Sequence, residues 1–292
     1  MIDMHIHTNN SDGTDSVKEL LEKAENLQLK YISITDHDTC RSYDELKNAN
    51  YTNLFSGTIV KGIEMKVFYN GGTIEVLGYK IDTEIMSQWL NDFYKDKSRE
   101  VLQKKYFNLL YGKCKQMGLL LADKENINWN PQKDWASFVI YTEIKNHLEN
   151  RKKVPDDLWE NFSGFNRKYC NDPKHILYID KSDDYPSLPE TINAIKKANG
   201  LVFMPHLYIY KWIKNKKQFI NDLINNYEID GIECYYTDFT EKETQYLLNL
   251  CDKKGLYKSG GSDYHGENKP RISLAKGYGN LNISEKIIEN WV

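Results

Sequence analysis

The 292-residue sequence has few cysteines and no long apolar run, and each shortage excludes a class of protein. Its five cysteines are widely spaced and form no CxxC motif, so they indicate neither a disulfide framework nor a cysteine zinc site. No segment approaches the roughly 18 consecutive apolar residues of a membrane span, and the N-terminal residues lack the pattern of a secretory signal. We therefore expect a cytoplasmic protein without a membrane partner.

A large excess of charge of one sign is also missing. The sequence has 39 Lys+Arg against 42 Asp+Glu, a formal net charge of −3, which argues against binding nucleic acid through a strongly basic surface. Hydrophobic residues make up 40% and charged residues 28%, as in ordinary globular proteins, so disordered, collagen-like and coiled-coil classes are excluded. The length allows one large or two ordinary domains.

Short apolar segments alternate with helical patterns near the start of the chain. MIDMHIH is followed by a helical pattern over residues 16–28 and then by YISIT, and this βα alternation predicts a parallel sheet. Ser16 and Glu19 form a capping-box pattern at the start of that helix. A second helix is predicted from Thr240 to Lys254, closed by Gly255. We therefore predict an α/β fold.

The middle of the sequence, residues 84–190, is predicted to be mostly helical. We interpret it as a subdomain inserted between residues 1–83 and residues 191–292. The alternative, that it continues the βα units of the same fold, stays open at this point.

Histidines and carboxylates gather at the predicted strand ends. His5 and His7 are two residues apart, so on a strand both imidazoles point to one face. The segment ISITDHDT places His37 between Asp36 and Asp38 at the C-terminal end of a strand, where sites form in parallel α/β folds. Asp12 lies in a polar turn, and its alternative role is in an Asx-turn.

Further carboxylates and histidines lie at later strands. Glu64 and Glu75 are embedded among β-formers, where an unpaired carboxylate is costly to bury. His206 follows the apolar segment LVFMP, and Asp263 and His265 are two residues apart in GGSDYHG. These imidazoles and carboxylates suit Mn, Zn or Fe, and nine groups are too many for one ion. Two or three divalent metal ions are therefore expected, a common device for phosphoryl hydrolysis.

The sequence resembles the PHP (polymerase and histidinol phosphatase) family of metal-dependent phosphoesterases. The motifs HIHT, TDHDT, GIE, LGY, PH and GSDYHG occur in that order, within about residues 1–80 and 185–270. The resemblance implies a distorted (β/α)7 TIM-like barrel with a trinuclear metal centre at the strand C-termini. The implied ligands are His5, His7, Asp12, His37, Glu64, His206, Asp263 and His265. Family members usually have His at the ninth position, where this sequence has Glu75, and a carboxylate can still bind a metal.

Within the family, the sequence is most similar to the subgroup that acts on nucleoside phosphates and on RNA from the 5′ end. The implied function is a hydrolase of phosphoric esters, acting on a nucleotide or nucleoside bisphosphate by a metal-bound hydroxide. Manganese is the expected ion, with zinc or iron as alternatives. The implied partner is a small phosphorylated substrate or a short single-stranded nucleic acid, covered by the helical insertion of residues 84–190.

We assign catalytic roles to four residues and phosphate binding to four arginines. The catalytic candidates are Asp36, Asp38, Asp263 and His265. The phosphate-binding candidates are Arg41, Arg99, Arg167 and Arg271, because the guanidinium fork matches two phosphate oxygens. Three alternatives stay open: a 5′-3′ exonuclease on short RNA or DNA, a non-catalytic PHP interaction module, and a barrel hydrolase of C–N bonds.

Overall fold

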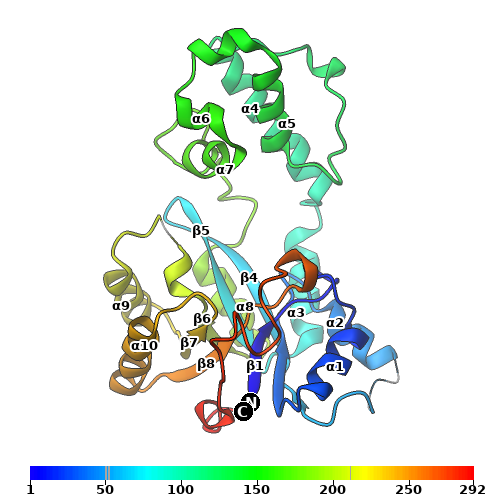
Figure 1. Ribbon diagram of the computed structural model, residues 1–292, viewed down its shortest axis with the longest axis vertical. Coiled ribbons are helices and arrows are strands. Elements are labelled where there is room, and N and C mark those ends of the chain that lie inside the picture. Colours follow the sequence, from blue (N-terminus) through cyan, green and yellow to red (C-terminus); the bar gives the residue numbers. More distant parts are fainter. Residues whose placement is uncertain (50, 52, 211) are drawn as a thin grey trace. The chain divides into compact units, whose positions relative to one another are not determined.

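The computed structural model describes residues 1–49, 51, 53–210 and 212–292, and of Arg167 the backbone alone (Figure 1). These residues divide into two compact units. Unit 1 comprises Met1–Val67, Ile74–Leu90 and Ser187–Val292, and unit 2 comprises Phe68–Thr73 and Asn91–Pro186. The domain boundaries and the substrate-covering role predicted for residues 84–190 stay predictions.

Among the described residues, eight strands form two sheets. They are β1 (Ile2–Ile6), β2 (Tyr31–Ile34), β3 (Thr58–Ile59), β4 (Gly62–Tyr69), β5 (Gly72–Tyr79), β6 (Leu201–Met204), β7 (Gly231–Tyr236) and β8 (Tyr257–Gly261). The first sheet has the order β1-β2-β3 with parallel pairs, and the second has the order β4-β5-β6-β7-β8. In the second sheet β5 and β6 are antiparallel, whereas β6, β7 and β8 run parallel.

Two isolated bridges link the sheets at the strand ends. Ile6 at the end of β1 pairs with Tyr264, and His37 after β2 pairs with Glu64 of β4. The C-terminal ends of β1, β2 and β8 therefore come together with β4. The predicted α/β fold is confirmed, and the closed (β/α)7 barrel stays a prediction.

Helices flank the strands of unit 1 in Figure 1. The α-helices of unit 1 are α1 (Val17–Asn26), α2 (Arg41–Asn48), α3 (Thr83–Tyr94), α8 (Leu188–Lys197), α9 (Lys216–Asn226) and α10 (Glu241–Lys254). Helix α3 continues into unit 2. Unit 1 also has the short helices η4 (Leu207–Ile209), η5 (Gly266–Asn268) and η6 (Glu285–Ile287). The predicted capping box of Ser16 and Glu19 is present at α1. Gly255 ends α10 in the left-handed conformation, which a glycine adopts without a steric cost.

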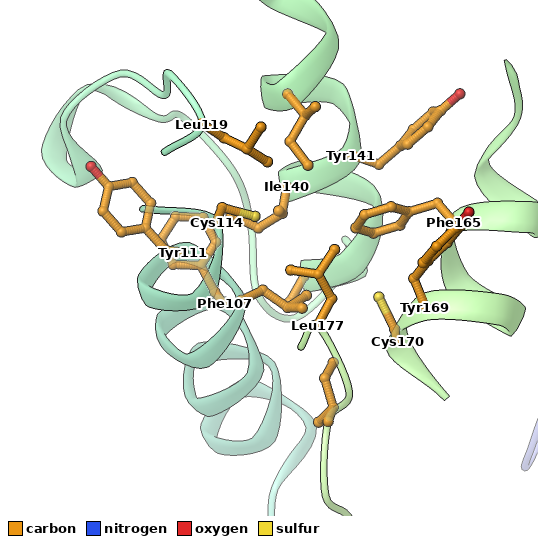
Figure 2. Close-up of a cluster of buried hydrophobic side chains, with 14 of the residues drawn as sticks. Phe107, Tyr111, Cys114, Leu119, Ile140, Tyr141, Phe165, Tyr169, Cys170 and Leu177 are labelled. Atoms are coloured by element: carbon orange, nitrogen blue, oxygen red, sulfur yellow. The ribbon is translucent and has the colours of Figure 1, made fainter. Parts of the chain in front are cut away.

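Unit 2 is helical and has a hydrophobic core of its own. Its elements are α4 (Arg99–Gln116), η1 (Lys124–Asn126), α5 (Ala136–Asn146), η2 (Leu148–Lys152), α6 (Asp156–Glu160), α7 (Phe162–Gly164) and η3 (Phe165–Cys170). Figure 2 shows Phe107 and Cys114 of α4 packed with Ile140 of α5 and Phe165 of η3. In the part of the chain that the structure describes, no helix is long and apolar enough to cross a bilayer.

The glycine pair Gly260 and Gly261 at the end of β8 allows close packing of backbone. A Cβ atom on Gly261 would lie 2.4 Å from Cβ of His5 and 2.5 Å from its backbone nitrogen. Glycine at position 261 therefore lets the end of β8 approach β1 beside His5, two residues before the candidate ligand Asp263.

We expect Gly261→Ala to lower the free energy of unfolding by about 1–3 kcal/mol, because the added methyl group overpacks against backbone. Gly112→Ala is the control, since among the described residues nothing lies within 4 Å of the added Cβ and alanine favours the α4 helix. Urea unfolding followed by circular dichroism measures both variants. Equal stability of Gly261→Ala and the parent protein would contradict the close approach.

Candidate metal centre

His5 in strand β1 and His7 directly after it face one side. His5 and His7 are both fully buried, and their ring centroids lie 5.2 Å apart. Met4 lies between them in the sequence and faces the other way, where it joins a core cluster with Ile2. One face of β1 therefore holds candidate ligands and the other holds core residues, as the HxH spacing predicts.

Glu64 of β4 lies at the centre of the cluster. Its Oε1 lies 2.7 Å from Nε2 of His206, which follows β6. Its Oε2 lies 3.2 Å from Nε2 of His5, 3.2 Å from Nε2 of His7 and 3.3 Å from Nδ1 of His37. Glu64 is only 1% exposed, so its carboxylate needs positive charge beside it. One carboxylate thus joins imidazoles from the ends of three other strands.

Asp263 and Asp12 extend the cluster on another side. Asp263 Oδ1 lies 3.4 Å from Nε2 of His7 and 3.3 Å from Nδ1 of His265. Asp12 Oδ1 lies 3.2 Å from Nε2 of His265, and its Oδ2 lies 3.7 Å from Nε2 of His37. The Asp12 side chain is 56% exposed, whereas that of Asp263 is 6% exposed. Asp12 therefore forms the solvent-facing side of the cluster.

Glu75 of β5 lies within reach of the same cluster. Its Oε2 lies 3.5 Å from Nε2 of His206, and its Oε1 lies 3.9 Å from Nζ of Lys66. Its backbone N–H donates a hydrogen bond of 2.8 Å to the hydroxyl of Tyr210, which is buried. The position where a histidine is usual in the family therefore places a carboxylate beside His206.

Three groups of side chains in the cluster could each hold a divalent cation. Within each group the donor atoms lie within 4.8 Å of one another. The groups are His7, Asp12, His37 and His265; His5, His7 and Glu64; and His37, Glu64 and Glu75. Each pair of groups has one residue in common, so the three candidate cation positions are neighbours.

Unsatisfied imidazole nitrogens provide a test of whether these residues fit a cation. In the described part of the chain, both ring nitrogens of His7 and Nδ1 of His37 are buried and lie 3.2–3.6 Å from carboxylate oxygens without forming a hydrogen bond. A buried polar atom without a partner is costly, and coordination to a cation would remove that cost. The combination of imidazole and carboxylate without thiolate suits divalent cations of borderline or hard character. The residues therefore fit bound divalent metal ions.

The charges in the cluster shift pKa values in opposite directions. Burial disfavours charged His5, but the carboxylates of Glu64 and Glu233 outweigh burial and hold the His5 pKa well above its usual value. Burial of His7 is likewise outweighed by Asp263 and Glu64, which raise its pKa to about 9. Burial would raise the pKa of Glu64, but the charge of nearby imidazoles holds it well below its usual value. The cluster thus favours bound positive charge.

Glu233 of β7 is a site residue that the sequence analysis misses. It is fully buried, and its Oε1 accepts a hydrogen bond of 2.9 Å from Nδ1 of His5. Its Oε2 accepts one of 2.7 Å from the backbone N–H of His206. The tripeptide Gly-Ile-Glu occurs at residues 62–64 and again at 231–233. Glu233 is therefore a carboxylate among β-formers in the same local pattern as Glu64.

Asp3 is a second buried carboxylate that sequence reasoning passed over. Its Oδ1 accepts hydrogen bonds from the backbone N–H of His5 at 3.2 Å and of Ser262 at 2.9 Å. Its Oδ2 accepts from the N–H of Ala275 at 2.7 Å and from the Ser262 hydroxyl. Burial raises the Asp3 pKa to about 6. Asp3 therefore joins β1 to the segment that carries Asp263.

Asp36 and Asp38, which we predicted to be catalytic, contact the backbone and hydroxyl groups of loops. Asp36 accepts hydrogen bonds from the N–H and hydroxyl of Thr8, both 2.7 Å, and from the Ser11 hydroxyl at 2.6 Å. Asp38 accepts one of 3.1 Å from the backbone N–H of Lys66. These contacts hold the loop before Asp12 and the middle of β4 in place, and a catalytic role for either aspartate stays a prediction.

The four candidate arginines lie in different surroundings. Arg41 is exposed in the first turn of α2, and Arg271 is exposed in the segment after β8. Arg99 belongs to unit 2, where its guanidinium carbon lies 4.3 Å from the centre of the Trp135 ring. The side chain of Arg167 lies outside the described residues. Phosphate binding by these arginines stays a prediction.

Backbone strain accompanies two of the candidate ligands. His206 has a φ of +27° and Asp263 a φ of +57°, both in the left-handed region that residues with a side chain rarely adopt. Such conformations cost about 1–3 kcal/mol each and persist where surrounding structure enforces them. The hydrogen bond from the His206 N–H to Glu233 is one such constraint.

Comparisons with known proteins show which family and which solved structures this chain is similar to. The family model described as PHP domain matches residues 3–150. A 5′-3′ exoribonuclease of Haemophilus influenzae is 24% identical over 99% of this chain and 97% of its own length. A 3′,5′-nucleoside bisphosphate phosphatase of Chromobacterium violaceum is 22% identical over 90% of this chain and 87% of its own. A solved structure from Bifidobacterium adolescentis, assigned as a metal-dependent phosphoesterase, has a similar fold, with a TM-score of 0.63 and 21% sequence identity. The similarity covers 99% of this chain and 94% of the other chain.

We expect Glu233→Gln to weaken metal binding by about 10- to 100-fold, as replacement of groups that orient ligand histidines typically does. An amide has one acceptor oxygen, so it leaves either the His5 ring N–H or the His206 backbone N–H without its acceptor. Titration with Mn²⁺ by calorimetry measures the affinity.

Glu228→Gln is the matched control for this substitution, because Glu228 is exposed just before β7. Metal affinity should be unchanged in the control variant. Equal affinities in Glu233→Gln and the parent protein would show that Glu233 does not orient a ligand.

Proposed function

This chain belongs to the PHP domain family and is a metal-dependent hydrolase of phosphoester bonds, and we propose that it acts on a nucleotide or nucleoside bisphosphate. The ions we propose are two or three divalent cations, with Mn²⁺ the preferred one. Imidazole and carboxylate ligands suit Mn²⁺, and Glu75 adds a further oxygen donor to the cluster.

The observation that carries this proposal is the sharing of residues among the three donor groups. His7, His37 and Glu64 each belong to two groups, so the cations would lie next to one another. Neighbouring cations about 3.5–4 Å apart are the usual arrangement for displacement at phosphorus, because both the attacking and the leaving oxygen can be stabilised. A single structural ion would need only one of these groups.

Bound divalent cations would supply Lewis-acid polarisation of the phosphoryl group and lower the pKa of water at the site. The chain's own residues do the remaining work. Glu64, His5 and His7 hold the buried side of the cluster, while Asp12 faces solvent, where a substrate enters. Glu233 fixes the orientation of the His5 ring through its Nδ1. No covalent intermediate with a protein side chain is required.

The substrate class rests on the relatives' names together with the family. The bisphosphate phosphatase of C. violaceum supports a nucleoside phosphate, hydrolysed to release inorganic phosphate. The exoribonuclease of H. influenzae, which matches 99% of the chain, supports a second candidate function, removal of nucleotides from the 5′ end of a short RNA. Both reactions use the same centre and differ in the leaving group.

The experiment that tests the proposal incubates Mn²⁺-loaded protein with a nucleoside 3′,5′-bisphosphate and, separately, with a short 5′-phosphorylated RNA. Mass spectrometry identifies the products. Inorganic phosphate from the bisphosphate is the result we expect. Stepwise release of mononucleotides would favour the exonuclease instead. Turnover of neither substrate would contradict the proposal and favour a non-catalytic module.

We expect Asp263→Asn to lower kcat by at least about 100-fold, because the amide keeps the shape but loses the charge that faces His7 and His265. Steady-state hydrolysis of the bisphosphate measures the loss. Asp252→Asn is the control, since Asp252 is 67% exposed on α10 and pairs with Lys258. A folded Asp263→Asn variant that keeps full turnover would show that the cluster is not the catalytic centre.

A further inference from the structure

A lysine that the sequence analysis did not single out lies at the edge of the metal centre. Nζ of Lys269 donates a hydrogen bond of 2.6 Å to Oδ2 of Asp263. The Lys269 side chain is 37% exposed, whereas that of Asp263 is 6% exposed. Its ammonium group therefore lies between a buried candidate ligand and solvent.

The two carboxylate oxygens of Asp263 have separate partners. Oδ1 faces the imidazoles of His7 and His265, at 3.4 Å and 3.3 Å. Oδ2 accepts hydrogen bonds from the Tyr236 hydroxyl at 2.8 Å and from Lys269. Oδ1 is thus directed toward the other candidate ligands, and Oδ2 keeps the hydrogen bond from Tyr236 as a second contact besides Lys269.

The loop that carries Lys269 is fixed to the loop that carries Asp12. The backbone N–H of Glu267 donates a hydrogen bond of 2.9 Å to the Thr14 hydroxyl. The side-chain amide of Asn268 donates one of 2.7 Å to the Asp12 carbonyl oxygen. The backbone N–H of Lys269 in turn bonds to the Gly266 carbonyl at 3.1 Å. Lys269 is therefore held at the side of the cluster where Asp12 faces solvent.

The ammonium group of Lys269 suits binding of a phosphate group. An ammonium group has three N–H donors, and the hydrogen bond to Asp263 uses one of them. Arg271, the sequence candidate two residues later, instead lies over the Tyr278 ring at 5.1 Å. Lys66 also borders the cluster, but its Nζ is 3.9 Å from Glu75, at the edge formed by β4 and β5.

We propose that Lys269 binds the phosphoryl group of the substrate, with its ammonium contacting Asp263 in the free protein and a phosphate oxygen in the complex. This inference rests on the proposed function and adds to it a specific recognition residue. The phosphate approaches from the solvent side of the cluster, next to Asp12, and Lys269 offsets its negative charge while the buried ligands hold the cations.

The test measures binding of inorganic phosphate to the Mn²⁺-loaded protein by calorimetry, with metal content determined on the same samples. We expect Lys269→Met to bind phosphate about 10- to 100-fold more weakly, as loss of a charge-assisted hydrogen bond predicts, with metal content unchanged. Lys269→Arg, which keeps the charge, should retain binding. Lys276→Met is the matched control, because Lys276 is exposed seven residues later, and should bind phosphate like the parent protein.

Two results would overturn the inference while leaving the proposed function intact. In one, Lys269→Met binds phosphate as tightly as the parent protein, or Lys66→Met loses binding in its place. In the other, Lys269→Met loses metal in parallel with phosphate, which would make Lys269 a residue that positions Asp263. If the parent protein binds Mn²⁺ but neither binds phosphate nor hydrolyses the two substrates, both the inference and the proposed function fail.

Discussion

The burial of the Glu64 carboxylate is the constraint on which the site depends. An ionised carboxylate away from water must be matched by positive charge, and four imidazoles lie within 3.3 Å of its two oxygens. Those imidazoles come from β1 and from the loops after β2 and β6. The strand ends must therefore meet around β4, and the same carboxylate charge that raises the pKa values of His5, His7 and His206 also attracts metal ions.

Packing around β1 fixes the position of His5 beside the Glu64 carboxylate. Asp3 accepts hydrogen bonds from the His5 backbone and from two groups near the end of β8, while Gly261 leaves room for the close contact. Met4, on the opposite face of the strand, packs with Leu77 and Phe203 in the core of unit 1. Ligand and core residues thus alternate along one five-residue strand, so the position of His5 is set by the hydrophobic core as much as by its polar partners.

Local sequence signals predict local features well, and long-range contacts far less so. The capping box at Ser16, the left-handed Gly255 and the α/β alternation depend on neighbouring residues, and the structure confirms them. The histidines and carboxylates at strand ends lie close together in space because parallel strands share one end. Glu233 and Lys269 escaped prediction for different reasons. Glu233 lies in a Gly-Ile-Glu segment like that of Glu64, so its local pattern was available but was not used, whereas Lys269 becomes notable only through a contact with Asp263.

The sequence pattern also does not predict the arrangement of the sheets. Alternating β and α segments predict parallel pairs, yet β5 pairs with β6 in the antiparallel sense, and the strands form two sheets. Antiparallel pairing follows from the direct turn between β4 and β5, which reverses the chain without a crossover helix. The spacing of residues in the sequence does not predict which later strand pairs with β5.

The sharing of His7, His37 and Glu64 among the three donor groups has a consequence for how the site fills. An ion in one group fixes the rotamer of a side chain that also serves the next group, so the conformational entropy of ordering that side chain is lost only once. Occupancy of neighbouring positions would therefore be coupled. A substitution of His7, His37 or Glu64 would accordingly remove a donor from two of the three groups at once.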